Sequence, residues 1–384
     1  MSKNTYVSLF SCAGIGCYGF KKAGWECLAS CELKEKYIEI QKINQKCLDP
    51  KQYICGDLSL DTTQSKVIDV VKSSLGTRKL DVVMATPPCQ GISLANHKKN
   101  QKDIERNSLV IDALTIIKTL SPKVFLLENV RCFLQTACLY QDEVVSIKDA
   151  IYKNLAELYD ISSNVINLKD FGNLSSRTRT IVIGVLKSHK TEAQTLLPPR
   201  VQAQSLWQVI GSLPSLKEMG EISENDVWHS FRPYSKHMRA WIQGLKPGES
   251  AFNNTNPLHR PHQIKNGVYK ENVNKNGDKY QRLLDTKVAP CIHTRNDILS
   301  SQNTIHPFDD RVLSVRELML LMTIPECFKW SRLSEQDIRQ LTPKQYTKIE
   351  RLVRTAIGEA VPTAFIYRFA KQIEKCLSLS STKE

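Results

Sequence analysis

Short apolar runs alternate with helical segments through the first half of the chain. Runs of strand length cover residues 5–10, 25–31, 53–57, 80–84, 123–127, 161–167 and 180–185. Helices are expected between several of these runs, over residues 17–24, 108–120 and 147–158. Strands that alternate with helices predict an α/β fold, with helices on both faces of a central sheet.

The periodic pattern stops at about residue 187. Residues 187–310 are rich in Asn, Pro, Gly and His, and aromatic and basic side chains alternate between Trp228 and Trp241. Helices are predicted again over residues 310–322, 334–355 with a break at Pro343, and 363–376. These changes in pattern predict three parts, with boundaries at 1–186, 187–310 and 311–384.

Composition narrows the class of protein. The chain has 384 residues and a net charge of +14, which favours a polyanionic partner such as nucleic acid. The excess charge is spread along the sequence, so it does not locate a binding surface. Because the chain has no apolar run of membrane length and no signal core at its N-terminus, we expect a soluble, cytoplasmic protein.

The twelve cysteines do not form a recognisable metal or redox motif. No Cys-x-x-Cys pair occurs among them. The sequence therefore lacks the usual signature of zinc ribbons and redox dithiols, and we expect no bound metal. Most of these cysteines are expected to be reduced and buried as small hydrophobic residues.

One stretch has unusual local chemistry. The apolar run over 80–84 leads into Pro87 and Pro88, then Cys89, Gln90 and Gly91. The two prolines end the strand and fix two φ angles, so the cysteine follows a stiff turn at the carboxyl end of a strand. Alpha/beta sheets place their sites at this edge. Taken alone, the stretch fits a buried structural cysteine equally well.

The first three strands also end in polar or glycine-rich positions. Phe10 leads into a turn that contains Gly14 and Gly16, the second strand ends at Glu32, and the third leads to Asp57. A glycine turn before a helix can present backbone N–H groups to a ligand. A carboxylate at the end of strand two can accept both hydroxyls of a ribose.

Taken together, these blocks resemble the DNA (cytosine-5) methyltransferase family. Pro87-Pro88-Cys89-Gln90 resembles its nucleophile loop, and Glu128-Asn129-Val130 resembles its second catalytic block. Its other blocks are similar to the stretches at residues 11–24, 175–179, 310–317 and 357–362, in the family's usual order. Four positions depart from the family pattern, namely Cys12, Ile15, Ser175 and Glu359.

The resemblance implies an S-adenosylmethionine-dependent, Rossmann-like methyltransferase sheet. It implies that residues 187–310 form a mostly β target-recognition domain. It also implies that the helix over 363–376 packs against the first domain. The cofactor residues it implies are Phe10, Ala13, Gly14, Gly16, Glu32, Asp57 and Val361. It also implies that Asp57 meets the adenine amino group. The polar segment over 91–106 corresponds to a mobile loop that closes over the target base.

The same resemblance assigns the catalytic chemistry. The thiolate of Cys89 adds to C6 of a flipped-out cytosine, and Pro88 shapes the loop. A protonated Glu128 can donate to N3, Arg177 can hold O2 of the base, and Arg179 is expected to support the loop. DNA contacts are expected from Gln90, Ser93, Lys98, Lys99, Arg232 and Arg239. The expected partners are double-stranded DNA and a cognate restriction endonuclease acting separately, with the methylase as a monomer in a bacterium.

Three alternatives remain open at this point. An RNA cytosine-5 methyltransferase would use the same blocks, but the long segment between Val185 and Asp310 favours DNA. A non-catalytic nucleic-acid-binding relative is disfavoured by the presence of Cys89, Glu128 and Arg177. A thiol redox protein is disfavoured by the missing Cys-x-x-Cys pair.

Overall fold

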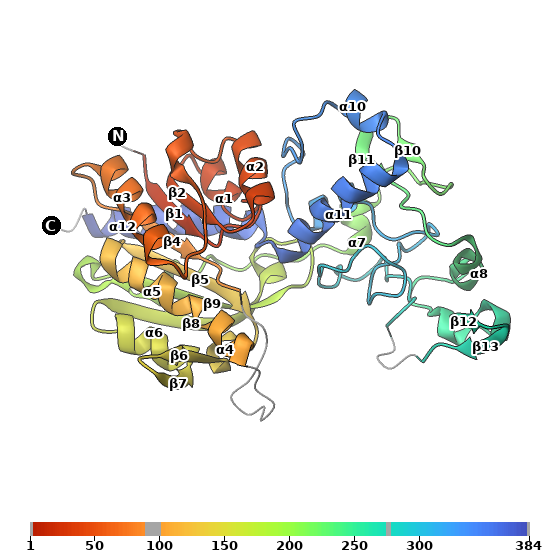
Figure 1. Ribbon diagram of the computed structural model, residues 1–384, viewed down its shortest axis with the longest axis horizontal. Helices are drawn as coiled ribbons and strands as arrows, with labels where there is room; N and C mark the ends of the chain where they lie inside the picture. Colours follow the sequence, from red (N-terminus) through yellow and green to blue (C-terminus); the bar gives the residue numbers. More distant parts are fainter. Residues whose placement is uncertain (1–2, 89–100, 274–277, 382–384) are drawn as a thin grey trace. The chain divides into compact units, whose positions relative to one another are not determined.

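The structure, a computed structural model, describes residues 3–88, 101–273 and 278–381. The chain forms two compact units (Figure 1). The sheet unit comprises residues 1–172, 178–201 and 361–384, and the loop unit comprises residues 173–177 and 202–360. The predicted sites Cys89, Gln90, Ser93, Lys98 and Lys99 lie outside the described residues.

A seven-stranded sheet is the centre of the sheet unit, in the order β3-β2-β1-β4-β5-β9-β8. Its strands are β1 (Thr5–Leu9), β2 (Glu26–Glu32), β3 (Tyr53–Cys55), β4 (Val82–Ala85), β5 (Val124–Val130), β8 (Tyr159–Asn167) and β9 (Thr178–Leu186). All neighbouring pairs are parallel except β5–β9 and β9–β8. The order reverses between β1 and β4, and α/β sheets commonly bind their ligands at the carboxyl ends of the strands beside such a reversal.

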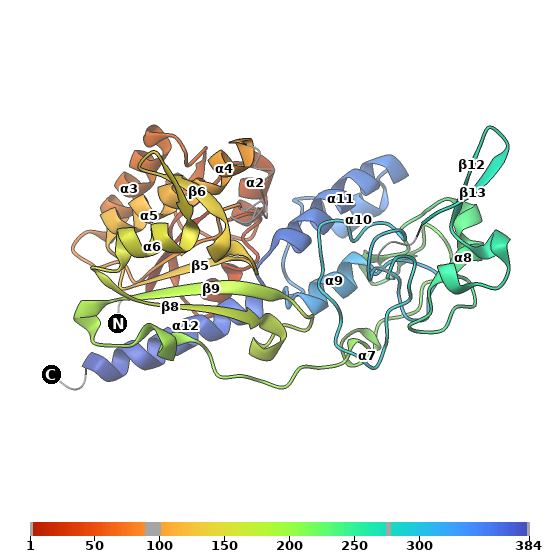
Figure 2. The same ribbon diagram turned by 90° about the horizontal axis from the view of Figure 1, so that it is seen from below.

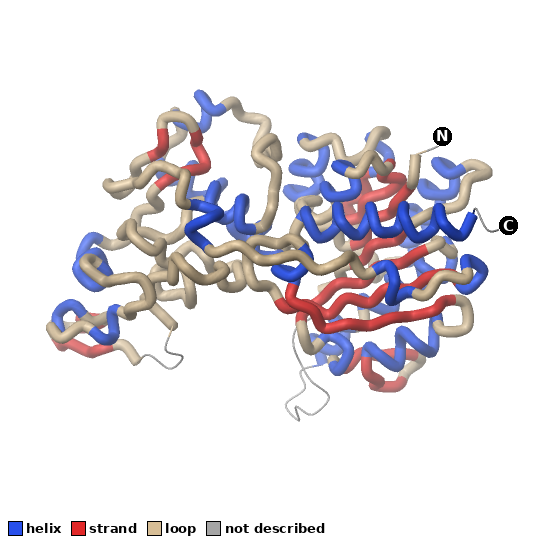
Figure 3. The backbone as a smooth tube through the Cα atoms, turned by 180° about the vertical axis from the view of Figure 1, so that it is seen from behind, coloured by secondary structure: helices blue, strands red, loops and turns tan. Residues whose placement is uncertain are grey.

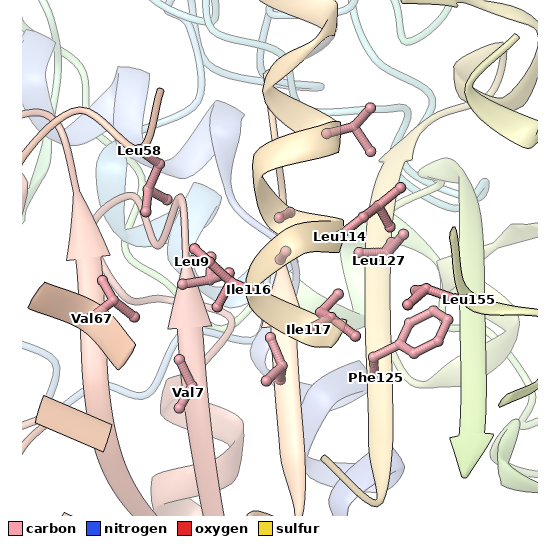
Figure 4. Close-up of a cluster of buried hydrophobic side chains, with 14 of the residues drawn as sticks. Val7, Leu9, Leu58, Val67, Leu114, Ile116, Ile117, Phe125, Leu127 and Leu155 are labelled. Atoms are coloured by element: carbon pink, nitrogen blue, oxygen red, sulfur yellow. The ribbon is translucent and has the colours of Figure 1, made fainter. Parts of the chain in front are cut away.

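Helices cover both faces of the sheet (Figures 2 and 3). Val7 and Leu9 join the cluster formed with α3 (Asp61–Leu75), α5 (Leu109–Leu120) and α6 (Ile147–Leu155), shown in Figure 4. Tyr6 joins the cluster on the other face, with α1 (Tyr18–Lys22) and α12 (Thr363–Ser381). Burial of both faces explains why these strands read as continuous apolar runs.

The last helix completes the N-terminal part of the fold. Helix α12 packs against α1, and the contact is so close that a Cβ on Gly19 would lie 2.5 Å from the backbone nitrogen of Tyr367. Only glycine fits at this crossing. Thr363 Oγ1 also donates to the carbonyl of Ile15, at 2.9 Å. The first turn of α12 is therefore fixed beside the turn that follows β1.

Each strand and helix expected in the sheet unit is present within a few residues, but several elements were not foreseen. These are α2 (Glu35–Ile43), α3, α4 (Gln101–Asn107), β6 (Ala137–Tyr140) and β7 (Glu143–Ser146), with 3-10 turns at Pro50–Gln52, Phe133–Gln135, Leu168–Phe171, Lys187–His189 and Ala193–Leu196. The loop expected over 91–106 is wrong from Gln101 onward, where α4 begins. The buried Asn107 amide explains the end of this helix, since it donates to the carbonyl of Ala137 in β6.

The two units differ from the expected domains in three places. Residues 187–201 belong to the sheet unit, because Ala193 and Leu196 are buried against β8, β9 and α12. Residues 173–177 belong to the loop unit, where Ser176 donates its backbone N–H to Ala289. Residues 311–360 also belong to the loop unit. The sequence pattern marked changes in periodicity, whereas these assignments depend on long-range contacts.

The loop unit contains short elements joined by long loops. Its strands are β10 (Ile222–Ser223), β11 (Asp226–Ser230), β12 (His262–Lys265) and β13 (Val268–Glu271). Its helices are α7 (Leu206–Ile210), α8 (Arg239–Ile242), α9 (Val315–Leu321), α10 (Glu335–Arg339) and α11 (Pro343–Glu359), with 3-10 turns at Lys236–Met238, Ala251–Asn253 and Pro257–His259. The predicted break at Pro343 is confirmed, because proline starts a new helix there.

A buried charge cluster holds the start of α9. The guanidinium of Arg311 binds both carboxylate oxygens of Glu317 at 2.8 Å, and it also pairs with Asp309. His306 accepts N–H bonds from Phe308 and Asp309 through Nδ1. Because each charge has a partner, the cluster can lie in the core of the loop unit.

This cluster predicts acid sensitivity of the loop unit. Burial lowers the pKa of His306 to about 4, despite the attraction of Glu317. Since the unfolded histidine titrates near 6.5, its contribution to stability is present above that pH and is lost as the pH falls toward 4. The loss amounts to about 3 kcal/mol at most. Burial by itself would raise the pKa of Glu317, but the positive charge of Arg311 lowers it well below its usual range, so the contribution of Glu317 disappears only at lower pH.

Urea unfolding between pH 4.5 and pH 7.5 measures this effect. In His306→Asn, the amide oxygen can replace Nδ1 as the acceptor without titrating in this range. We expect a shallower decline of the unfolding free energy with falling pH in the variant than in the wild type. Parallel pH profiles of the two proteins would show that His306 does not cause the decline.

Candidate active site

The backbone that leads to Cys89 is fixed from both sides. Thr86 Oγ1 donates to the carbonyl of Phe10 at 2.8 Å, which ties the end of β4 to the turn after β1. Asn129 Nδ2 donates to the carbonyl of Pro87 at 2.5 Å, which ties the same segment to the end of β5. Pro87 is buried and Pro88 is exposed. The described chain therefore arrives at residue 88 in a defined position at the carboxyl edge of the sheet.

Glu128 and Arg179 form an ion pair at this edge. Glu128 lies near the carboxyl end of β5, and Arg179 lies at the start of the antiparallel β9, opposite Val130. Arg179 Nε is 3.1 Å from Glu128 Oε1, and the two side chains are 14% and 8% exposed. The antiparallel register explains the pair, because it brings the beginning of β9 beside the end of β5. A carboxyl group and a guanidinium thus lie next to the segment that leads to Cys89.

Arg177 has a different environment. Its guanidinium donates to the carbonyls of Ile292 at 3.0 Å and Gly358 at 3.2 Å, within the loop unit. The side chain is buried, with 3% exposed. The structure therefore gives Arg179 the contact with Glu128 and gives Arg177 a role in holding loop-unit backbone. Which of the two arginines holds O2 of the base stays a prediction.

The glycine turn after β1 is strained and anchored by Glu32. Phe10 and Cys12 adopt φ angles of 54° and 46°, and Gly14 adopts 79°. Cys12 thus has a conformation that favours glycine, which is the residue many family members carry there. Glu32, 7% exposed, accepts the N–H of Cys12 at 2.8 Å and that of Lys34 at 2.9 Å. The carboxylate at the end of β2 therefore shapes the turn directly.

The remaining predicted cofactor residues lie around the same edge. Asp57 accepts from the N–H and the hydroxyl of Ser59 through Oδ1. Ala13 is fully buried. A Cβ on Gly16 would lie 3.0 Å from Cβ of Val361, so the segment just before α12 packs against the turn. The structure brings the turn and Val361 together, and β2 and β3 end at Glu32 and just before Asp57.

A buried polar network that the sequence did not predict lies beneath the turn. Gln41 donates to Ser11 Oγ at 2.8 Å and to the carbonyl of Cys12 at 2.6 Å, and it accepts from Ser30. Lys46 Nζ donates to Ser30 Oγ at 2.8 Å. Gln41 and Lys46 are 1% and 7% exposed. The polar Gln41 among the apolar positions of α2 was the available signal, since a buried amide needs hydrogen-bond partners.

The two arginines expected to contact DNA make contacts inside the loop unit. Arg232 forms ion pairs with Glu350 and, at 3.6 Å, with Asp297. Arg239 lies 3.4 Å from Asp310 and donates to the carbonyl of Lys217 at 2.9 Å. Their charges are therefore largely compensated within the chain.

Two kinds of feature are absent from the part of the chain that the structure describes. No group of three or more His, Cys, Asp or Glu side chains could hold a metal ion there. None of the helices in that part is long and apolar enough to cross a membrane.

The sheet order, with its reversal between β1 and β4 and its antiparallel β9, is that of the S-adenosylmethionine-dependent methyltransferase fold. A family model described as "C-5 cytosine-specific DNA methylase" matches residues 4–375, and the chain belongs to this family. The resemblance seen in the sequence is confirmed, and the chain is a DNA (cytosine-5) methyltransferase. Use of S-adenosylmethionine is implied by the family.

Individual relatives cover nearly the whole chain. Type II methyltransferase M1.HgaI of Avibacterium volantium is 31% identical over 386 residues, which cover 97% of this chain and 99% of that protein. Type II methyltransferase M1.HphI of Haemophilus parahaemolyticus is 28% identical, with 93% and 86% covered. A solved putative DNA modification methyltransferase from an E. coli prophage has a TM-score of 0.68 at 18% identity, with 98% and 100% covered. At that identity it supports the fold alone.

Proposed function

We propose that this protein methylates C5 of a flipped-out cytosine in a specific duplex DNA sequence, through a covalent bond between Cys89 Sγ and C6 of the base. It would act as the modification enzyme of a type II restriction-modification system. A cognate endonuclease acting separately would leave the methylated sequence uncut. The observation that carries the proposal is the Glu128–Arg179 pair beside the anchored segment that leads to Cys89.

Cys89 supplies the nucleophile in this proposal. Its thiolate adds to C6, which forms the Sγ–C6 bond and moves electron density to C5. After C5 has gained the methyl group, loss of the C5 proton breaks the Sγ–C6 bond and restores the thiolate and the aromatic ring. The target base must leave the helical stack first, at a cost of a few kcal/mol.

Glu128 and Arg179 act on the edge of the base. Glu128, carrying a proton, donates to N3 and accepts from the exocyclic amine, so it stabilises charge that develops on the ring. Arg179 is already paired with Glu128 at 3.1 Å, and its remaining N–H donors can hold both that carboxyl and O2 of the base. We therefore assign to Arg179 the contact that the sequence suggested for Arg177.

The edge formed by β1, β2 and β3 suits the cofactor. S-adenosylmethionine, when bound, would supply a methyl group on a sulfonium centre that C5 can attack, and S-adenosylhomocysteine would be the leaving product. Glu32 has further lone pairs beyond its two backbone N–H contacts, so it can accept ribose hydroxyls. Asp57 Oδ2 has no hydrogen-bond partner among the described residues and can accept from the adenine amine. Val361 and Gly16 would border the methionine part.

A transfer assay tests the proposed function. The protein is incubated with methyl-labelled S-adenosylmethionine and either duplex DNA of mixed sequence or tRNA. We expect label in DNA, and bisulfite sequencing of a plasmid carried with the gene should show protected cytosines within one short sequence. Label in tRNA alone would support the RNA alternative, and label in neither would contradict catalysis.

Glu32→Ala tests the cofactor assignment. Because the variant removes the carboxylate at the end of β2, we expect the affinity for S-adenosylmethionine to fall about 10- to 100-fold in calorimetry. Glu32→Gln keeps one acceptor oxygen, so its affinity for S-adenosylmethionine should lie between those of Glu32→Ala and the wild type. Glu157→Ala removes an exposed carboxylate of the same unit and should bind normally. Unchanged affinity in a folded Glu32→Ala would remove this residue from the site.

A further inference from the structure

The two strands of the β12–β13 ribbon in the loop unit are joined by a tight two-residue turn. Its strands pair in antiparallel register, with Gln263 opposite Lys270. Asn266 and Gly267 connect them with φ angles of 51° and 75°. Positive φ at both turn residues, with the sequence Asn-Gly, is typical of a type I′ turn, which matches the twist of a two-residue hairpin. The ribbon is therefore narrow at its tip and fixed in register.

One face of the ribbon is attached to its own unit. The His262 ring lies 5.3 Å from the Trp241 ring and 4.7 Å from the Tyr269 ring. The Tyr269 hydroxyl donates to the carbonyl of Pro257 at 3.0 Å. These contacts explain how an isolated two-stranded sheet, which is only marginally stable alone, is held in place. Figure 2 shows the ribbon beside α8.

The opposite face carries side chains suited to reading bases. Gln263, Val268 and Lys270 alternate with the attached residues, so they point to the other side of the ribbon. All three are exposed. The side chains of Gln263 and Lys270 make no hydrogen bond or ion pair with another described residue, in contrast to the compensated Arg232 and Arg239.

The charge around the ribbon favours DNA as its partner. Residues 257–273, which include both strands, contain three Lys or Arg residues against one Glu. The major groove, about 12 Å wide, admits a two-stranded β-ribbon. In that groove, glutamine can bind adenine N6 and N7, lysine can bind guanine O6 and N7, and an apolar side chain can contact the thymine methyl.

We propose that the Gln263–Lys270 face of the β12–β13 ribbon enters the major groove and determines part of the recognised DNA sequence. This inference rests on the proposed function, since it names the element that selects the site to be methylated. The ribbon reads bases near the target cytosine, while the residues of the sheet unit carry out the transfer.

The test compares methylated sequences rather than activity alone. Wild type and the double variant Gln263→Ala/Lys270→Ala methylate a random-sequence plasmid library, and the protected sites are determined by bisulfite sequencing. We expect the variant to remain active but to accept other bases at one or more positions. Its kcat/KM on the original site should fall roughly 10- to 100-fold.

Two control variants test whether the effect is specific to the Gln263–Lys270 face and whether it arises from the loss of any surface lysine. Ile264→Thr alters an exposed side chain on the attached face, and Lys118→Ala removes an exposed lysine from α5 in the sheet unit. Both should retain the wild-type sequence preference. An unchanged sequence preference in the double variant would overturn the inference. If the activity of that variant fell equally on all sequences, the ribbon would contact phosphates rather than bases, and if the activity did not change, the ribbon would not contact the DNA. Failure of the wild type itself to methylate DNA would instead contradict the proposed function.

Discussion

Cys89→Ser is expected to abolish methyl transfer and covalent trapping together. Serine oxygen is far less nucleophilic toward C6 than a thiolate, so no adduct should form. On duplex DNA that carries 5-fluorocytosine at the target, loss of the C5 proton is blocked. The wild type should therefore remain bound through denaturing electrophoresis, whereas the variant should not. The variant should still bind the duplex and flip the base, because these steps do not need the Sγ–C6 bond.

Peptide mapping of the trapped complex identifies the residue that forms the bond. Eleven other cysteines are present, and Cys327→Ser offers a control because it changes an exposed thiol of the loop unit. This control should trap DNA normally. An adduct on any residue other than Cys89, or full activity in Cys89→Ser, would overturn the proposed mechanism.

Lysine substitutions at Arg177 and Arg179 should affect different properties, namely stability for Arg177 and methyl transfer for Arg179. Lysine keeps the charge but loses the planar set of donors that an arginine presents. In Arg179→Lys, the contact with Glu128 and the base edge is weakened, and we expect methyl transfer to fall about 100-fold with little change in stability. In Arg177→Lys, the bonds to Ile292 and Gly358 are disturbed, and we expect unfolding to become easier by about 2 kcal/mol.

Single-turnover rates and urea unfolding of both variants distinguish these roles. Arg177→Lys should keep near-normal activity at temperatures where it is folded. The reverse result, with activity lost in a stable Arg177→Lys and retained in Arg179→Lys, would restore the assignment expected from the sequence.

The sheet could be predicted because its signal is local. Apolar runs that end in Phe10, Glu32, the Pro87-Pro88 pair and Glu128 mark both the strands and the edge at which they end. The proximity of these strand ends could also be predicted, because parallel strands place their carboxyl ends at one edge of the sheet. By contrast, α3 and α4 were not foreseen, because their polar segments resemble surface loops when their packing partners are unknown.

Several features of the site depend on contacts that no local pattern contains. Ser11, Ser30 and Gln41 come from three separate elements and meet only beneath the folded turn. The predicted DNA contact of Arg232 was based on residue type, but its ion pair with Glu350 joins residues far apart in the chain. The exposed face of the β12–β13 ribbon could not be identified from a segment that lacks strong periodicity.

The sequence alone determined the family, the sheet and the order of its site-bearing strand ends, because each depends on residue types within short stretches. The tertiary structure decided which side chains meet across those stretches. Arg177 and Arg179 are two residues apart and chemically identical, so no local property separates them. The register of β9 against β5 places Arg179 on Glu128, whereas the preceding segment pairs with the loop unit and buries Arg177 against backbone carbonyls.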